Sequence, residues 1–319
     1  MFRNLLIAIL LVSFSFARSL AQQAAPTPAE ASKAKPAPDS AADLVLRGTK
    51  LSHEGRQDDA LILFRLAIEK APDSFEAYLG VGIALDLNGD YAKARENFSK
   101  AIDLAPAEAK SQPQRALAVS YAFEGNTFKA AESEMQVFNA RLAKSDSVAA
   151  AETCTELGRI YLEAGDPDHA YKWYMLGYNT VAKKPDLSDA DKNLWLFRWE
   201  NAQARIAAQR GKADEAQQHV RAAKAALDKA NNPEQMKFYP YLTGYVAFYT
   251  GDYKTAVADL QKADQLDPAV QALLAEAYEK SGDAAQAKAH YQRVLNSNGH
   301  NPAIAFARPL AKKKLAGGA

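Results

Sequence analysis

The fold is decided by residues 78–106, which read YLGVGIALDLNGDYAKARENFSKAIDLAP. Apolar residues recur at intervals of three and four on both sides of Gly89, which is typical of two amphipathic helices separated by a turn. Glycine adopts the left-handed backbone conformation that satisfies the last carbonyls of a helix. Asp90 follows it and is suited to accept hydrogen bonds from the first amides of the next helix. The stretch therefore predicts a helix–turn–helix unit.

The same pattern recurs around seven glycines, at positions 55, 89, 125, 165, 211, 251 and 282. A Gly or Ala stands seven residues before each of them, and an alanine stands five residues after each. These alanines are Ala60, Ala94, Ala130, Ala170, Ala216, Ala256 and Ala287. Because two helices approach closely only where a side chain is small, we expect the small residues to mark helix crossings. Larger residues nine positions after the glycine are expected to fill the remaining core, namely Phe64, Phe98, Tyr174, Leu260 and Tyr291.

These offsets resemble those of the tetratricopeptide repeat, a helix–turn–helix unit of about 34 residues with a proline near its end. The resemblance is best in the first two units, where Pro72 and Pro106 lie 34 residues apart. It implies an all-α fold, a right-handed superhelical solenoid of about seven such repeats over residues 42–302. The glycine spacing is largest, 46 residues, between Gly165 and Gly211, so we expect longer helices in the middle units.

The two ends of the chain differ from the repeats in composition. Residues 1–21 carry a basic start, an apolar run and small residues before Ala21, which predicts an export signal cleaved near Ala21. Residues 22–41 are rich in Ala and Pro and are expected to form a disordered linker. Residues 303–319 include three consecutive lysines and are expected to form a basic, poorly ordered tail. These features predict a periplasmic or secreted protein with no stable membrane insertion after cleavage.

The composition limits the possible functions. The 319 residues include 39 Lys and Arg against 38 Asp and Glu, so no excess of positive charge favours nucleic acid. Cys154 is the only cysteine, which excludes an internal disulfide and a cysteine-based metal cage. By its place in the repeat, Cys154 is expected to be a buried, inert core residue.

No pattern in the sequence indicates catalysis or a bound metal or cofactor. The five histidines, at positions 53, 169, 219, 290 and 300, lack partners at metal-ligand spacing and are expected on the solvated surface. Glu152 and Glu156 are interpreted as carboxylates on an exposed helix face. We expect no enzyme activity, no metal and no cofactor.

The concave face of a solenoid is its usual binding surface, and it is lined by the first helix of each unit. Reading those positions gives a strip of arginines followed by aromatics, the candidate partner-binding residues Arg159, Arg198, Asn201, Arg205, Phe238, Tyr241, Tyr245 and Phe248. Arg and aromatic side chains dominate interface energetics, so the strip is suited to an extended peptide or a partner helix. The competing interpretation is packing between neighbouring units. If the strip binds, Ala at Tyr241 and Tyr245 is expected to abolish capture of a partner without loss of stability.

Some members of the family grip a peptide's terminal carboxylate with Lys and Asn at particular concave positions. This chain has Val45 and Thr49, then Leu79 and Ile83, at those positions, so that role is not carried over. The resemblance favours a non-catalytic scaffold of the cell envelope or extracellular space that binds a protein or peptide. The alternative is a glycan- or peptidoglycan-binding accessory subunit of an envelope enzyme, which would use Trp173, Trp195 and Trp199.

Overall fold

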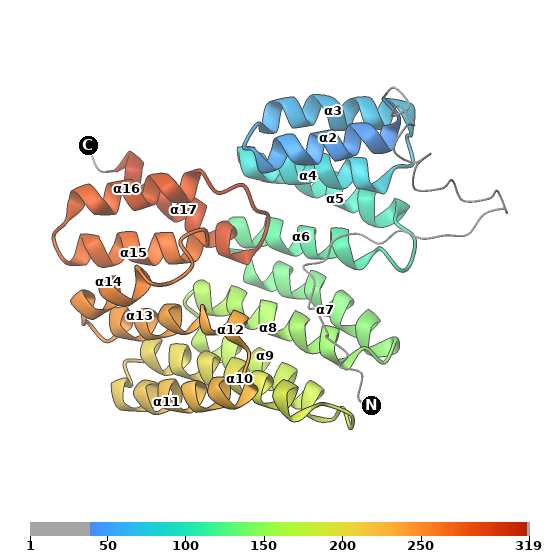
Figure 1. The fold of residues 1–319 in the computed structure, drawn as a ribbon. Helices are drawn as coiled ribbons and strands as arrows, with labels where there is room; N and C mark the ends of the chain where they lie inside the picture. Colours follow the sequence, from blue (N-terminus) through green and yellow to red (C-terminus); the bar gives the residue numbers. More distant parts are fainter. Residues whose placement is uncertain (1–38, 318–319) are drawn as a thin grey trace, which may run out of the picture. The chain divides into compact units, whose positions relative to one another are not determined.

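A computed structural model describes residues 39–317 of the chain. The predicted signal, 1–21, and nearly all of the predicted linker, 22–41, lie outside the described residues. Every regular element in the described part is a helix (Figure 1). The helices are α2 Ala41–His53, α3 Gln57–Lys70, α4 Phe75–Asn88, α5 Tyr91–Leu104, α6 Ser111–Phe123, α7 Thr127–Ala143, α8 Ser147–Glu163, α9 Pro167–Ala182, α10 Asp189–Gln209, α11 Ala213–Ala230, α12 Pro233–Met236, α13 Tyr239–Tyr249, α14 Tyr253–Leu260, α15 Pro268–Lys280, α16 Ala284–Leu295 and α17 Pro302–Ala316.

The helices form seven hairpins, each closed by one of the seven predicted glycines. The pairs are α2/α3, α4/α5, α6/α7, α8/α9, α10/α11, α13/α14 and α15/α16. All seven turn glycines have positive φ, between 71° and 95°. Each hairpin also packs against the next in chain order (Figure 1). The predicted all-α repeat solenoid is confirmed.

The second helix of most hairpins begins with a side-chain cap. Asp90, Asp166, Asp252 and Asp283 each accept a hydrogen bond from the backbone N–H three residues on. Asn126 does the same at the start of α7. These caps satisfy amides that have no partner within the helix, and they fix where the chain re-enters a helix after the turn.

Small residues let the two helices of a hairpin meet, as the sequence predicts. A methyl group added to Gly82 of α4 would lie 2.4 Å from the Phe98 ring of α5, and the equivalent distance from Gly48 to Phe64 is 2.8 Å. Gly158 faces Tyr174 in the same way. The seven alanines on the second helices are all buried. The core is therefore built from a glycine or alanine on one helix opposite a large ring or leucine on its partner.

The middle units contain longer helices, as expected from the glycine spacing. The longest is α10, with 21 residues, and α11 has 18. The chain leaves α9 at Ala182, passes Pro185, and begins α10 after Ser188, whose hydroxyl caps the new helix.

The predicted poorly ordered tail at 303–319 is wrong for the part that the structure describes. Pro302–Ala316 forms α17, which packs against α6, α8, α15 and α16. Ile304, Ala305 and Ala311 are fully buried or nearly so, and the tail's Lys314 pairs with Glu279 at 2.7 Å. The helix forms despite its lysines, because burying the apolar face of α17 against its neighbours stabilises it.

Two histidines predicted to be solvated are buried instead. His300 lies just before α17 and its Nε2 is 2.8 Å from Oδ2 of Asp86 in α4, with both side chains almost inaccessible. His290 is 5% exposed and bonds to Gln271. His300 thereby joins the second unit to the C-terminal end of the chain.

Candidate functional site

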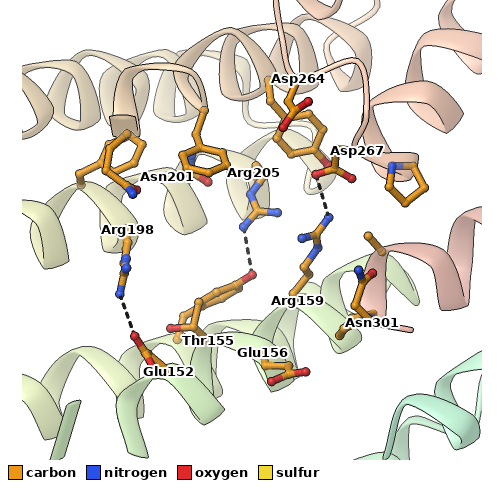
Figure 2. Close-up of a pocket in the computed structure, with 18 of the residues that line it drawn as sticks. Glu152, Thr155, Glu156, Arg159, Arg198, Asn201, Arg205, Asp264, Asp267 and Asn301 are labelled. Atoms are coloured by element: carbon orange, nitrogen blue, oxygen red, sulfur yellow. Dashed lines mark hydrogen bonds and ion pairs between the residues drawn. The ribbon is translucent and has the colours of Figure 1, made fainter. Parts of the chain in front are cut away.

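The predicted strip leads to a cavity of about 720 Å³ between the first helices of several hairpins (Figure 2). Its wall is built from α6, α8, α10, α13 and the beginnings of α15 and α17. Six of the eight predicted binding residues line it: Arg159, Arg198, Asn201, Arg205, Phe238 and Tyr241.

Two helices supply most of the polar lining because their residues repeat at helical spacing. On α10, Arg198, Asn201 and Arg205 are three and four residues apart and share one face. On α8, Glu152 and Arg159 contribute from the facing side. To the same space α10 therefore presents two cations and an amide, and α8 presents a cation and carboxylates.

Three of the four cavity arginines pair with carboxylates. Arg115 of α6 contacts Glu156 at 2.6 Å and donates two hydrogen bonds to it. Arg198 lies 3.9 Å from Glu152, and its guanidinium carbon is 4.5 Å from the centre of the Trp195 ring.

The two pairs of Arg159 are longer than that of Arg115, about as long as that of Arg198, and carry no hydrogen bond. Arg159 lies 3.9 Å from Asp267 and 3.8 Å from Glu163. Its Nε and one Nη have no hydrogen-bond partner among the described residues.

Arg205 is the exception among the four. Its side chain is 8% exposed, and it has no carboxylate within ion-pair distance in residues 39–317. One Nη donates a hydrogen bond of 3.0 Å to the Tyr174 hydroxyl, while Nε has no partner in the same part of the chain. The Tyr174 and Tyr245 rings lie near the guanidinium, at 5.8 and 5.7 Å.

Apolar groups lie among these polar ones and at the edge of the cavity. Leu266, in the loop before α15, is 88% exposed although it is a large apolar residue, and Phe238 is 38% exposed. Tyr241 and Phe197 are more deeply placed in the lining. A cavity with an apolar wall and a few convergent polar groups is the usual form of a ligand site.

The two remaining predicted residues are packing residues, and the expectation for Tyr245 needs correction. Tyr245 is 1% exposed and its hydroxyl accepts a hydrogen bond of 2.7 Å from Gln209. Phe248 packs in the core formed by α13, α14 and α15. Ala at Tyr245 is therefore expected to destabilise the fold, because removing a buried aromatic side chain typically costs about 3–5 kcal/mol.

The repeat pattern of the sequence does not indicate several of the residues that line the cavity. Glu152 is exposed, as expected, and lies near Arg198 of α10, whereas Glu156 is partly buried and accepts hydrogen bonds from Arg115 of α6. Asp267 and Asn301 cap α15 and α17, each directly before a proline at the first helical position. That cap-and-proline signature, which also begins α9 at Asp166 and Pro167, could have revealed α17.

The tryptophans pack against neighbouring helices. Trp195 is 6% exposed, and the Trp199 ring lies 5.5 Å from the Tyr178 ring and 5.8 Å from the Tyr171 ring. Trp173 packs against the cores around Tyr174 and Phe138. These contacts favour core filling over a platform for sugar rings.

Cys154 is buried, as predicted. Burial, with a smaller contribution from the charge of Glu134, raises the pKa of its thiol to about 12. The reactive species is the thiolate, so this thiol is inert at neutral pH.

Within residues 39–317, no three His, Cys, Asp or Glu side chains form a group suited to a metal ion. Over the same residues, no helix combines the length and the apolar character that crossing a membrane requires.

Comparison with known proteins identifies the repeat. Four family models described as tetratricopeptide repeat match residues 75–108, 151–178, 201–222 and 247–308. The sequence matches none of the curated proteins.

Two solved structures are similar in fold. A tetratricopeptide repeat protein from Parabacteroides merdae is 14% identical, with a TM-score of 0.50 over 85% of this chain and 98% of its own. The apo form of RapI is 13% identical, with a TM-score of 0.53 over 86% of this chain and 99% of its own. At this identity the likeness concerns the fold alone.

Three of the four matches fall on a single hairpin each, α4/α5, α8/α9 and α10/α11, and the fourth runs from the end of α13 into α17. The turn glycines of these hairpins all have positive φ. The chain is a tetratricopeptide repeat protein.

Proposed function

We propose that this protein is a non-catalytic scaffold that binds an extended segment of a protein partner in the cavity between α8, α10 and α13. The observation that carries the proposal is the convergence of Arg159, Arg198, Arg205 and Tyr241 on one space, although they come from three helices. Repeats of this family serve as protein-interaction scaffolds, and the first helices of such hairpins are where partners usually bind.

The chemistry of the lining supports a peptide. Arg and aromatic side chains are the residue types that contribute most to protein interfaces. Leu266 and Phe238 offer apolar surface at the edge of the cavity, while Arg205 and Asn201 offer donors within it. The volume, about 720 Å³, falls in the range of sites that enclose a small ligand or a few side chains of a peptide.

We further propose that the protein works in the cell envelope or outside the cell. The support is the sequence of residues 1–21, with its basic start, apolar run and small residues before the expected cleavage at Ala21. Mass spectrometry of the protein from cells checks this: a mature chain beginning near Gln22 is expected, and an intact N-terminus on cytoplasmic protein would contradict it.

Binding is tested with short peptides selected from a displayed library against the full chain. Leu266→Asp places a charge at the edge of the cavity, and Phe128→Asp, on α7, makes the same change at a site that is 74% exposed and outside the cavity. Because both positions are exposed, both variants are expected to keep the stability of the parent. We expect calorimetry to show weaker binding for Leu266→Asp alone. Equal affinity of both variants for every selected peptide would reject the cavity as the binding site.

A further inference from the structure

Two positive charges at the centre of the cavity lack the partners that burial normally requires. In Figure 2, Arg205 and Arg159 lie beside each other, between the Arg198–Glu152 pair and Asn301. Within residues 39–317, Arg205 has no carboxylate within ion-pair distance, and Arg159, whose side chain is 29% exposed, has only the two long pairs at 3.8 and 3.9 Å. Three nitrogens of these two groups are buried without a hydrogen-bond partner in the described residues: Nε of Arg205, and Nε and one Nη of Arg159.

This arrangement is costly for the protein alone. Removing a charged group from water costs several kcal/mol unless a partner of opposite charge is close and well oriented. The two guanidinium groups also repel each other. Arg115 shows the contrast within the same cavity, because Glu156 takes two hydrogen bonds from it. Among the residues that the structure describes, Arg205 has one hydrogen bond, to a tyrosine hydroxyl, and two aromatic rings near its guanidinium.

Two neighbouring carboxylates, those of Asp264 and Asp267, accept backbone hydrogen bonds, while the Glu163 carboxylate lies 3.8 Å from Arg159 with one buried oxygen that has no hydrogen-bond partner in the described residues. The Asp267 side chain accepts a hydrogen bond from the backbone N–H of Ala269, and the Asp264 side chain accepts one from that of Leu266. The N-terminal ends of α15 and α17 border the same cavity, and helix N-termini favour negative charge. The cavity is therefore suited to an anion beside Arg205, which has no carboxylate within ion-pair distance in residues 39–317, whereas Arg159 has Glu163 and Asp267 nearby.

We propose that the cavity recognises a carboxylate of its bound segment, held by Arg205 and Arg159, with an adjacent apolar side chain packed against Phe238 and Tyr241. This deepens the proposed function by naming the chemistry that the segment must carry. A guanidinium offers a planar pair of donors that matches a carboxylate. Because the two arginines lie in the middle of the lining, wall extends on both sides of them. We therefore assign the carboxylate to an Asp or Glu side chain within an extended segment.

The first test uses a small probe, and a variant serves only to assign the signal. Phenylacetate carries a carboxylate beside an aromatic ring, and phenylacetamide has nearly the same shape without the charge. Both are titrated into the full chain while the arginine Nε–Hε resonances are followed in a proton–nitrogen correlation spectrum. Arg205→Lys, which removes one resonance and keeps the charge, assigns the signal. We expect phenylacetate to shift the Arg205 resonance to saturation and phenylacetamide to leave it unchanged. Equal shifts from both probes, or no shift from phenylacetate, would overturn the proposal.

The second test compares the loss of the unpaired guanidinium with the loss of an ion pair elsewhere. Arg205→Met removes the unpaired guanidinium, whereas the double variant Arg95→Gln, Glu124→Gln removes an ion pair outside the cavity. A lost hydrogen bond to a charged group corresponds to about a tenfold or larger loss of affinity, so Arg205→Met is expected to weaken phenylacetate binding by about that factor. The double variant is expected to bind within about twofold of the parent. The opposite order would overturn the proposal, and Arg205→Lys replaces Arg205→Met if the latter fails to fold.

The third test separates this inference from the proposed function. In a peptide that binds the cavity, Asp→Asn or Glu→Gln is expected to lower affinity about tenfold, and amidation of the peptide's C-terminus is expected to have little effect. The reverse pattern would assign the subsite to a chain end and overturn the proposal. A peptide whose binding depends on Leu266 but on no carboxylate would overturn this inference and leave the proposed function standing. Absence of any cavity-binding peptide would overturn the proposed function itself.

Discussion

Gly82 provides a sharp test of the helix pairing, because its replacement by alanine should act against the usual trend. In the interior of an isolated helix, Gly→Ala stabilises by about 1 kcal/mol. In α4, however, the new methyl carbon would lie 2.4, 2.6 and 2.9 Å from three carbons of the Phe98 ring. Phe98 is fully buried, so its ring has no free space into which it can move. Overpacking of this kind costs about 1–3 kcal/mol. The difference between this cost and the helix-propensity gain is a net loss of up to about 2 kcal/mol, so we expect Gly82→Ala to lower the free energy of unfolding by up to that amount.

The assay is urea unfolding followed by circular dichroism, with a rescue in the same hairpin. Phe98→Leu shortens the side chain that meets the methyl group, so the two changes together should cost at least about 1 kcal/mol less than the sum of the single changes. An increase in stability for Gly82→Ala, or additive effects in the double variant, would refute the account of how small residues set the helix crossings.

Three further predictions concern buried polar groups. Burial, and then the charge of Glu156, raise the pKa of Glu134 well above its ordinary value. The folded state therefore favours the protonated acid, and the protein loses folding stability as the pH rises through this raised pKa. Glu134→Gln should therefore raise the melting temperature at pH 8 with little effect at pH 4, and an equal change at both would contradict this. His300→Ala leaves the buried Asp86 carboxylate without one of its partners and should cost about 1–3 kcal/mol in urea unfolding, whereas an unchanged midpoint would show that the contact contributes nothing. Cys154 should resist iodoacetamide at pH 8 in the folded protein and react in denaturant, as mass spectrometry would show, and rapid labelling of the native chain would refute its burial.

The repeat could be predicted from the sequence because its determinants are local. A glycine at each turn, a cap directly after it and an alanine five positions on all act within one hairpin, and Gly89 and Asp90 illustrate the first two. The same local reasoning predicts α17 from Asn301 and Pro302, whereas the lysines near its end are typical of a disordered tail and favour the wrong prediction.

The site could be predicted only in part, because a cavity depends on segments far apart in the sequence. Arg198 and Arg205 of α10 both line the cavity, because their helical spacing fixes a shared face, and this shared face can be predicted from the sequence. In α13 the same helical spacing does not predict the lining correctly, because the Tyr245 side chain is buried in the core. Nothing near Arg159 indicates Asp267 as its neighbour, since that contact spans more than a hundred residues and arises from packing between hairpins.

The central claim is that a partner segment binds within the cavity lined by Arg159, Arg205 and Tyr241. The most direct measurement places a photo-cross-linking amino acid at Leu266, at the edge of the cavity, or at Phe128, outside it, and maps the products formed with a selected peptide by mass spectrometry. The account predicts cross-links from position 266 to residues of the peptide and none from position 128. Efficient cross-linking from position 128, with none from position 266, would contradict it.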